Sequence, residues 1–367
     1  MSDRPAKGRA DGSRRLLEKM ARGPAGWLSG DGPRSSIVLS SRVRLARNLK
    51  GVPFGARAGD DGREVVVAET KGAAGAVPAL RGSVYIDVAA LPEIDRQLLV
   101  ERHLISRDLA ADGGSRGVLV APDERLSVLV NEEDHLRLQC VASGYQLETA
   151  WGAADELDTE IASRLAYAFS DAWGYLTACP TNVGTGMRAS VLVHLPALVL
   201  TKQIGRVLQG ITQVGLAVRG LHGEGTEVMG NFFQVSNQAT LGLAEADIVR
   251  NLIRVTQQII DNEDSAAEVL LRDARAEIED KVFRSYGILS HCRVISTEEV
   301  MSLSSAVRLG VHLGILGATP VATLNKILVL TQPAHLEHAL RLTPESAPDH
   351  KRADMIRSLL APSPSSN

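Results

Sequence analysis

Arginine residues recur in four short stretches of the chain that also contain glycines or acidic residues. The stretches are "SSRVRLARN" (40–48), "NEEDHLR" (131–137), "CPTNVGTGMRAS" (179–190) and "RGLHGEG" (219–225). Guanidinium groups bind phosphate oxygens through paired N–H donors, and glycines let backbone N–H groups approach the same oxygens. Arg42 and Arg44 are two residues apart, so on an extended segment they face the same side. This combination favours a site that binds phosphate groups.

Two of these stretches also carry glutamates that could act on a second substrate. A pocket built only of arginines would repel a cationic acceptor, and carboxylates at one end would reverse that preference. Glu133 and Glu224 could hold a guanidinium in plane and accept a proton while its nitrogen attacks phosphorus. Such help is needed because the pKa of a free arginine side chain is above ~12. These residues therefore indicate phosphoryl transfer to a guanidinium.

Each motif also has a simpler structural explanation. An arginine pair on a strand usually faces solvent, an acidic run usually marks a turn, and a lone cysteine is most often a small buried group. We assign Cys140 and Cys292 to that last class. His335, Glu337 and His338 in "HLEH" are too few to indicate a metal site. The chain has neither a GxxxxGK[ST] phosphate loop nor the HRD and DFG motifs of protein kinases.

The composition describes a folded, mildly acidic protein. The chain has 367 residues, 44% hydrophobic content and a formal net charge of −3, which favours two domains and argues against a protein that coats nucleic acid. Three cysteines without a CxxC pair, and a charged N-terminal stretch without an apolar signal core, favour a reducing, cytoplasmic compartment. The apolar stretch at 310–330 contains polar residues, so we expect buried helices there rather than a membrane span.

Hydrophobic periodicity predicts an α+β fold. Short strands are expected at 83–88, 125–131 and 135–142, and the last two should form an antiparallel pair across the turn "EED". Apolar spacing predicts helices over 148–169 and 197–215, and an all-helical region from about 246 to 330.

We expect four parts along the chain. Residues 1–35 should form a flexible N-terminal segment and residues 354–367 a C-terminal tail, because their compositions are poor in core-forming residues. Residues 36–265 should form the α+β domain that carries the four motifs. Residues 266–353 should form an all-helical domain, with the boundary near "DNEDSA".

Taken together, the four motifs resemble those of the ATP:guanido phosphotransferases, the family that includes arginine kinase and creatine kinase. The resemblance extends from about Ser36 to the end of the helical part, and the motifs stand in the family's order. It implies a catalytic domain with an antiparallel sheet flanked by helices, followed here by an all-helical C-terminal domain. It also implies ATP as phosphoryl donor, with a bridging Mg²⁺.

The resemblance implies roles for individual residues. Glu133 matches the carboxylate that acts as base, Glu224 its partner across the guanidinium, and Cys179 the reactive cysteine beside the acceptor nitrogen. We expect Cys179 to support acceptor binding as a thiolate, without a covalent intermediate. His103 matches a histidine at the adenosine end of the site. The arginines matched to the nucleotide phosphates are Arg42, Arg44, Arg137, Arg188 and Arg219. The complete set of residues matched to the ATP-binding segments is Ser40, Ser41, Arg42, Val43, Arg44, His103, Arg137, Arg188, Ala189, Ser190, Val191, Leu192, Arg219, Gly220, Leu221, His222, Gly223 and Glu224.

The acceptor implied by the resemblance is an arginine side chain on a protein. The small-molecule kinases of the family have an N-terminal helical domain that closes over free arginine or creatine, whereas a short irregular segment precedes the first motif here. The added C-terminal helices are instead similar to those of the bacterial protein arginine kinases. That branch implies protein substrates with exposed arginines, a homodimer formed by the helical domain, an McsA-like zinc-finger activator and marking of substrates for the Clp protease.

Two other functions stay open at this stage. A kinase for a free guanidino metabolite would use the same motifs, and it would prefer free arginine to an unfolded protein as acceptor. A non-catalytic adaptor would bind partners through the C-terminal helices. All five arginines and both glutamates are present, which argues against the adaptor.

One C-terminal motif departs from the pattern of the protein kinases in this family. Their RDxxRA motif forms a regulatory pocket for phosphoarginine, and the matching stretch here is "PDHKRA" (348–353). Asp349 would contact the guanidinium of that ligand, and Arg352 its phosphate. Pro348 replaces the leading arginine and has no donor to offer, so we expect a weakened pocket, with Lys351 as a partial substitute.

Overall fold

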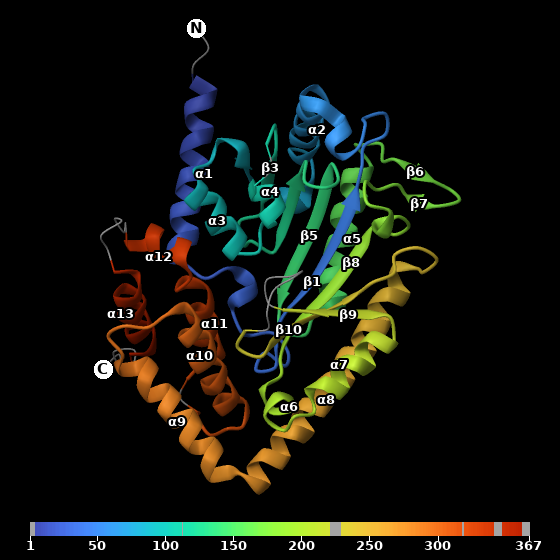
Figure 1. Ribbon diagram of the computed structural model, residues 1–367. Coiled ribbons are helices and arrows are strands. Elements are labelled where there is room, and N and C mark those ends of the chain that lie inside the picture. Colours follow the sequence, from blue (N-terminus) through green and yellow to red (C-terminus); the bar gives the residue numbers. More distant parts are fainter. Residues whose placement is uncertain (1–3, 112, 221–228, 318, 341–346, 362–367) are drawn as a thin grey trace.

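A single antiparallel sheet of eight strands lies at the centre of the molecule (Figure 1). The computed structural model describes residues 4–111, 113–220, 229–317, 319–340 and 347–361. Within them the strands lie in the order β2-β3-β4-β5-β1-β8-β10-β9. Their bounds are β1 (Val38–Arg47), β2 (Val84–Asp87), β3 (Gly117–Val120), β4 (Leu126–Val130), β5 (Leu136–Ser143), β8 (Met187–His194), β9 (Leu216–Arg219) and β10 (Phe232–Asn237). A separate hairpin consists of β6 (Phe169–Ser170) and β7 (Gly174–Tyr175).

The two faces of the sheet differ in polarity because side chains alternate along each strand. On one face, Val43, Cys140 and Val191 belong to the main hydrophobic core. Two helices cover this face, α5 (Leu147–Ala162) and α8 (Glu245–Asp273). The opposite face carries the even-numbered residues of β1 from Ser40 onward and those of β8, which include the arginines of two motifs.

The structure confirms the α+β fold and most of the expected elements. β2, β4 and β5 occupy the three segments predicted as strands, and β4 pairs with β5 in antiparallel register. The helix predicted over 148–169 ends earlier, at Ala162. The helix predicted over 197–215 is interrupted, because Lys202 adopts a left-handed conformation (φ 59°). The two resulting helices are α6 (Pro196–Leu200) and α7 (Ile204–Gln213).

The N-terminal segment is not the flexible chain that we expected. α1 (Arg4–Arg22) is a helix, and Leu17, Met20 and Ala21 bury their side chains in a second core with strands β2 and β3. Arg102 also donates hydrogen bonds to the carbonyls of Met20 (2.6 Å) and Gly23 (2.9 Å). The prediction was wrong because these three apolar residues have helical spacing and find a partner surface that overall composition does not reveal.

Six helices, α8 to α13, form the C-terminal part of the described chain. After α8 they are α9 (Arg275–His291), α10 (Thr297–His312), α11 (Val321–Leu330), α12 (Pro333–Leu340) and α13 (Pro348–Leu360). α8 and α9 meet in a V at the bottom of Figure 1. The expected boundary after residue 265 falls inside α8, where Ala266 and Leu270 still belong to the main core. α13 likewise includes residues 354–360, which we had expected in the tail.

The apolar stretch at 310–330 lies at the end of α10 and in α11. Leu324, Ile327 and Leu328 are buried there. Within the described ranges we find no helix with both the length and the apolar character needed to cross a bilayer.

Helix α12 docks against α3 (Glu93–Glu101), an element of the N-terminal half. The Glu101 carboxylate accepts hydrogen bonds from the backbone N–H groups of Ala334 (3.0 Å) and His335 (3.1 Å), and it pairs with His335 Nδ1 (2.8 Å). His338 Nε2 lies 2.5 Å from a carboxylate oxygen of Asp95. Both histidines of "HLEH" therefore face acidic residues of α3, and the contacts join the C-terminal helices to the N-terminal half of the chain.

Candidate active site

The arginines singled out in the sequence face the same side of the sheet. Strand register places Arg44 of β1 opposite Arg188 of β8, and Arg42 lies two residues from Arg44 on the same strand. Arg137 of β5 is opposite Ala46, again two residues from Arg44. Because side chains alternate with a period of two, these four guanidinium groups share one face.

Arg219 joins the same face from the edge strand β9. It pairs with Gln234 of β10, which in turn pairs with Leu192 of β8. Leu192 is four residues from Arg188, so both side chains lie on one side of β8. We call the resulting surface the arginine face, and its members are Arg42, Arg44, Arg137, Arg188 and Arg219.

Within the arginine face, Arg42 and Arg44 lie beside other positive charges. The pKa of Arg42 is lowered to about 10, first by burial and then by the charges of Arg137 and Arg188. Burial and the same neighbours hold the pKa of Arg44 well below its ordinary value, with Glu132 opposing them. Nε of Arg44 is buried without a hydrogen-bond partner among the described residues. Since arginine does not lose its proton in proteins, such a cluster favours the binding of an anion.

A small cavity opens beside Arg42. His103 lies in its wall with a positive φ of 59°, and its ring is 5.3 Å from the ring of Trp27 in an edge-on arrangement. The carbonyl of His103 accepts a hydrogen bond from Gln139 (2.9 Å). The complete lining is Trp27, Ser40, Arg42, His103, Val141, Ser190, Leu192 and Gln234. The structure thus brings the histidine assigned to the adenosine end next to the arginine face.

The acidic turn after β4 places two glutamates beside Arg137, and they differ in exposure. Glu132 forms a two-pronged ion pair with Arg137, with both N–O distances at 2.5 Å, and its side chain is only 4% exposed. Glu133 lies 3.6 Å from the same guanidinium and is 45% exposed. Glu132 therefore balances the charge of Arg137, while Glu133 remains accessible. We did not identify Glu132 from the sequence, although its place beside Glu133 in "NEED" was a usable signal.

Glu133 and Cys179 come together from distant parts of the sequence. The Cys179 thiol lies 3.0 Å from the Thr181 hydroxyl and near enough to the Glu133 carboxylate to lower its pKa, and the Asn182 side-chain amide donates to that carboxylate (3.4 Å). Burial raises the pKa of Glu133, and Asp134 raises it further, although Arg137 and Cys179 oppose them. A carboxylate with a raised pKa is a stronger proton acceptor than an ordinary glutamate, which suits the role of base.

Asp134 ties the acidic turn to the loop that carries Cys179. One oxygen of its buried carboxylate accepts hydrogen bonds from the Asn48 side chain (2.6 Å) and from the backbone N–H of Ala178 (2.6 Å). Because Glu133 precedes Asp134 and Cys179 follows Ala178, this contact fixes both candidate functional groups. The sequence offered a hint, since Asn48 and Asp134 each lie in a motif without an assigned role.

Two glycines let the cysteine loop, residues 179–186, pack closely against its neighbours. Gly184 has φ 109°, and a side chain there would bring Cβ to 2.4 Å from the carbonyl oxygen of Thr240. Gly186 has φ 63°, and its Cβ would meet the carbonyl oxygen of Ala46 at 2.6 Å. Only glycine fits both positions, as the tight turn expected from the sequence requires.

Several residues matched to the ATP-binding segments do not point toward the arginine face. Val43, Ala189 and Val191 are fully buried in the main core on the other side of the sheet. Ser41 also points away, because its hydroxyl donates to the carbonyl of Gly144 (2.9 Å). For these four positions the resemblance identifies the strand, and strand alternation excludes the side chain from the site.

The segment that follows Arg219 is only partly described. Gly220 is the last described residue before a gap in the description. The matched residues Leu221, His222, Gly223 and Glu224 lie outside the described residues, so the place of Glu224 in the site stays a prediction.

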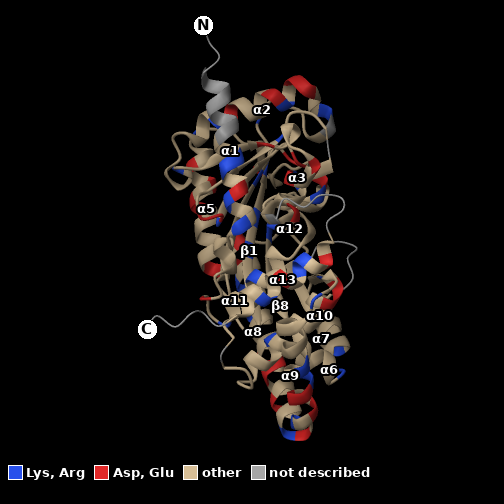
Figure 2. Ribbon diagram, turned by 90° about the vertical axis from the view of Figure 1, so that its left-hand side faces the viewer, with Lys and Arg blue, Asp and Glu red and all other residues tan. Residues whose placement is uncertain are grey.

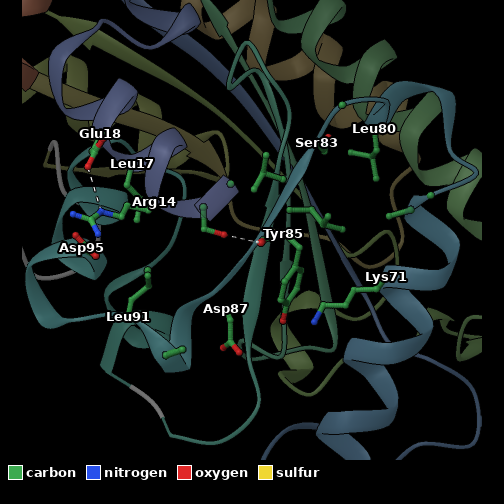
Figure 3. A pocket seen from close by; sticks show the side chains of 18 of the residues that line it. Arg14, Leu17, Glu18, Lys71, Leu80, Ser83, Tyr85, Asp87, Leu91 and Asp95 are labelled. Carbon is green, nitrogen blue, oxygen red and sulfur yellow. Dashed lines mark hydrogen bonds and ion pairs between the residues drawn. The ribbon is translucent and has the colours of Figure 1, made fainter. Parts of the chain in front are cut away.

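A larger hollow, about 1500 Å³, lies elsewhere, between α1, α2 (Gly59–Ala74), β2 and α3 (Figure 3). Nζ of Lys71 is 3.7 Å from the centre of the Tyr85 ring, and the Ser13 hydroxyl donates to the Tyr85 carbonyl (3.3 Å). Charged residues of both signs, including Arg14 and Glu18, line it. None of the residues of the four arginine-containing motifs lines this hollow, so we do not place the active site there.

The two residues assigned to a regulatory pocket contact each other on α13. Arg352 is buried and forms an ion pair with Asp349 in the first turn of the helix. Its guanidinium also donates to the carbonyls of Thr331 (3.0 Å) and Ile295 (2.8 Å). In this structure Arg352 thus joins α13 to the end of α11 and to the segment that enters α10.

Comparison with known proteins supports the same family along most of the chain. Residues 70–266 match the family model "ATP:guanido phosphotransferase, C-terminal catalytic domain", and residues 275–367 match "Protein-arginine kinase McsB C-terminal domain". The chain is 48% identical over 339 residues to the protein-arginine kinase of Halothermothrix orenii, covering 91% of this chain and 96% of that protein. It is 44% identical over 340 residues to the protein-arginine kinase of Bacillus subtilis, covering 91% and 93%.

The fold has solved relatives as well. The duplicated taurocyamine kinase from Schistosoma mansoni aligns with a TM-score of 0.59 and 28% identity, over 64% of this chain and 34% of that duplicated chain. Lombricine kinase aligns with a TM-score of 0.58 and 23% identity, over 68% of this chain and 76% of that one, and supports the fold alone. With the arginine face and the glutamate–cysteine pair in place, these matches show that the chain belongs to the protein-arginine kinases of the ATP:guanido phosphotransferase family.

Proposed function

We propose that this protein transfers the γ-phosphoryl group of ATP to arginine side chains of other proteins. The observation that carries the proposal is the arginine face, where arginines from four strands share one side of the sheet and the charges of their neighbours lower the pKa values of Arg42 and Arg44. Next to it, Glu133 and Cys179 form a polar, partly exposed end that suits a cationic acceptor. The names of the relatives support an arginine on a protein as that acceptor.

The nucleotide would bind with its phosphates against the arginine face and its adenosine toward the cavity at His103. Mg²⁺ would enter with ATP, held mainly by phosphate oxygens and water, as is usual for this ion. Phosphoryl transfer depends on alignment and on neutralisation of charge more than on covalent help from the protein. The five arginines supply that neutralisation.

In the proposed reaction, a guanidinium nitrogen of the acceptor attacks the γ-phosphorus. The bond from phosphorus to the bridging oxygen breaks, and ADP leaves with the electron pair. The proton released by the attacking nitrogen passes to the Glu133 carboxylate. Cys179, which lies beside Glu133, would contact the same guanidinium without forming a covalent bond, and Glu224 would hold it from the other side.

The central test is Glu133→Gln, with Glu224→Gln beside it. Removing one group that stabilises the transition state costs a factor of about 10² to 10³ in turnover, so phosphoarginine formation should fall by that much while ATP affinity stays nearly unchanged. Mass spectrometry of an unfolded acceptor protein, at a pH that preserves the acid-labile P–N bond, measures the product, and calorimetry measures ATP binding. Glu69→Gln, an exposed glutamate of α2, is the matched control. Turnover of the Glu133 variant within about threefold of wild type would refute its role as base.

The acceptor class needs its own comparison. Wild-type enzyme is offered free arginine and an unfolded protein at equal concentrations of arginine side chains. Faster phosphorylation of the protein supports our proposal, whereas a preference for free arginine would favour a kinase for guanidino metabolites.

We also propose a homodimer formed by the helical region. Phe283 and Ile288 on α9 and Val294 just beyond it are 53%, 44% and 53% exposed, which is unusual for side chains of this size. Acidic and basic residues both occur along the same helix (Figure 2). Exposed apolar groups within a charged surface suit a partner copy. Light scattering at micromolar concentration should give twice the mass of the chain, and Phe283→Lys should lower that mass.

Three further parts of the proposal rest on the family resemblance. They are a McsA-like activator, delivery of phosphorylated substrates to a Clp protease, and a cytoplasmic location. The three free cysteines of the structure suit a reducing compartment. Regulation by phosphoarginine should be weak, because Pro348 offers no donor and Arg352 is already engaged by Asp349 and two carbonyls. Pro348→Arg should strengthen activation by free phosphoarginine.

A further inference from the structure

We propose that an apolar surface on both sides of the cysteine loop binds the polypeptide that carries the acceptor arginine. We call it the flanking surface, and its members are Phe169, Trp173, Leu241 and Leu243. The inference rests on the proposed function and adds the kind of substrate: an unfolded segment with apolar or aromatic residues near its arginine.

The four side chains are unusually exposed for their size. Phe169 is 55% exposed, Trp173 58%, Leu241 49% and Leu243 48%. Ten large hydrophobic side chains of the described residues are exposed to a similar degree, and these four lie in only two short segments. Clustered apolar groups at a surface mark a place where another molecule binds.

Backbone contacts hold the two segments against opposite sides of the cysteine loop. On one side, the N–H of Tyr175 in the β6–β7 hairpin donates to the carbonyl of Gly184 (2.8 Å). On the other, the N–H of Thr185 donates to the carbonyl of Thr240 (3.0 Å), and the Thr240 hydroxyl donates to the carbonyl of Thr181 (2.9 Å). In Figure 1 the hairpin lies at the right-hand edge, above the start of α8. The loop therefore runs between the two apolar segments.

The same loop forms the acceptor end of the active site. It begins with Cys179, whose thiol lies beside Glu133, and it contains Asn182, whose amide donates to that carboxylate (3.4 Å). A guanidinium bound at Glu133 must therefore carry its main chain past this loop. A free guanidino metabolite would leave the flanking surface bare, whereas a polypeptide would extend across it on one side or both.

The hairpin is a firm support for such contacts. The ring of Phe169 lies 5.2 Å from that of Tyr175, and the guanidinium carbon of Arg47 lies 3.5 Å from the centre of the Tyr175 ring. Arg47 is itself locked by Asp158 in the core. The hairpin that carries the exposed aromatic residues is thus anchored to the sheet, so binding a substrate costs little conformational entropy there.

The test uses the double variant Trp173→Ser/Leu243→Ser in the full chain. The acceptors are two peptides of equal length and charge, one with its arginine between leucine and phenylalanine residues, the other with it between serine and glycine residues. We expect KM for the apolar peptide to rise about tenfold, because losing well-packed apolar contacts commonly costs at least that factor. KM for the polar peptide and for ATP should change by less than twofold. Val65→Ser/Val214→Ser, two exposed apolar residues outside the flanking surface, is the control.

The alternatives give different results. Equal losses on both peptides would show a general defect of the acceptor site, and no loss on either would show that substrates do not touch this surface; both outcomes overturn the inference. A loss of mass in light scattering with unchanged peptide kinetics would show that a second copy of the chain covers the surface instead, and would overturn it too. If wild-type enzyme phosphorylated neither peptide but did phosphorylate free arginine, the proposed function itself would fail.

Discussion

Strand β1 carries arginines on both faces of the sheet, and the surroundings of these arginines differ between the two faces. Arg47 points into the core and is 1% exposed. Its Nη2 lies 2.6 Å from Asp158, and its Nη1 donates to the carbonyls of Ala46 (3.0 Å) and Thr185 (2.8 Å). Burial alone would lower the pKa of Arg47, but Asp158 more than compensates and the pKa is raised. On this face, the carboxylate and carbonyls of the folded chain neutralise and hydrogen-bond the guanidinium without a ligand.

Arg42 and Arg44, on the other face, lie beside other arginines. Their pKa values are lowered by burial and by further arginines, and neither forms an ion pair with a described residue. A lowered pKa by itself does not mark a ligand site, however. Burial also lowers the pKa of Arg308 to about 9, yet its nitrogens donate to Asn325 (2.7 Å) and to the carbonyls of Ser36 (3.0 Å) and Ser35. What separates Arg44 from Arg308 is that its buried Nε has no hydrogen-bond partner among the described residues and that other arginines lie beside it.

The comparison separates residues that hold the fold from residues that bind substrate. Breaking a buried, fully paired ion pair lowers the free energy of unfolding. A cluster of like charges lowers it as long as no anion is bound. Substitutions on the two faces of the same strand should therefore have opposite effects on activity and stability.

The largest effect should come from Arg188→Lys and Arg44→Lys on the arginine face. Lysine keeps the charge but loses the planar fork that contacts two oxygens. We expect kcat/KM for ATP to fall by a factor of about 10² or more, while the urea midpoint stays unchanged or rises slightly. Steady-state kinetics and urea denaturation give both quantities. Wild-type turnover and ATP affinity in Arg188→Lys would mean that this residue does not contact the phosphates.

The corresponding variant on the core face of β1 is Arg47→Gln, which should affect stability. Removing one partner of a buried ion pair leaves Asp158 uncompensated, and such changes cost about 3–5 kcal/mol of unfolding free energy. Urea denaturation measures the loss. The double variant Arg47→Gln/Asp158→Asn should recover part of it, since neither side then carries an unpaired charge. A loss below about 1 kcal/mol would show that Tyr175 and the two carbonyls, rather than Asp158, hold this arginine.

The sequence predicted the arginine face better than the partners of its members. Alternation along strands is a local rule, so Arg42 and Arg44 could be placed on one side from their spacing alone. The rule says nothing about which face is covered, and it did not identify Arg47, three residues further on, as the core arginine. Its partner Asp158 belongs to α5, and only the assembled fold brings the two together.

The N-terminal helix and the acidic turn also show that local sequence patterns do not reveal which residues pack together. Composition suggested a flexible segment before residue 35, but Leu17 and Met20 find an apolar surface built from β2, β3 and α3. In "NEED", the two glutamates look equivalent in sequence. Only the path of the turn decides that Glu132 pairs with Arg137 at 2.5 Å and that Glu133 stays accessible.

A polyanion should stabilise the protein through the arginine face. A ligand that binds only the folded state at a hundred times its Kd adds about 2.7 kcal/mol of stability. Tripolyphosphate, which has no adenosine, should therefore raise the thermal midpoint of wild type, and Arg44→Gln should abolish most of that rise. Arg14→Gln, an exposed arginine on α1, serves as the control and should keep it. An equal rise in Arg44→Gln would place the anion outside the arginine face.

The smallest effect concerns Glu263, a buried acid whose partners carry no charge. It is fully buried in α8, and its carboxylate accepts hydrogen bonds from the backbone N–H groups of Ala197 (2.8 Å) and Leu198 (3.0 Å). Burial raises its pKa to about 7, and the two hydrogen bonds only partly oppose the shift.

The folded pKa of Glu263 therefore lies above the unfolded one, and between them the folded state binds more protons. Its contribution to stability is fully present below the unfolded pKa and is lost as pH rises through about 7. Between pH 6 and pH 8 wild type should lose about 1 kcal/mol relative to Glu263→Gln, which does not titrate. Urea denaturation of both proteins at pH 6, 7 and 8 gives this difference. If the stability difference stayed constant with pH, or grew in favour of wild type, the two hydrogen bonds would be keeping the carboxylate ionised. Neutral donors would then stabilise a buried charge as well as Asp158 does for Arg47.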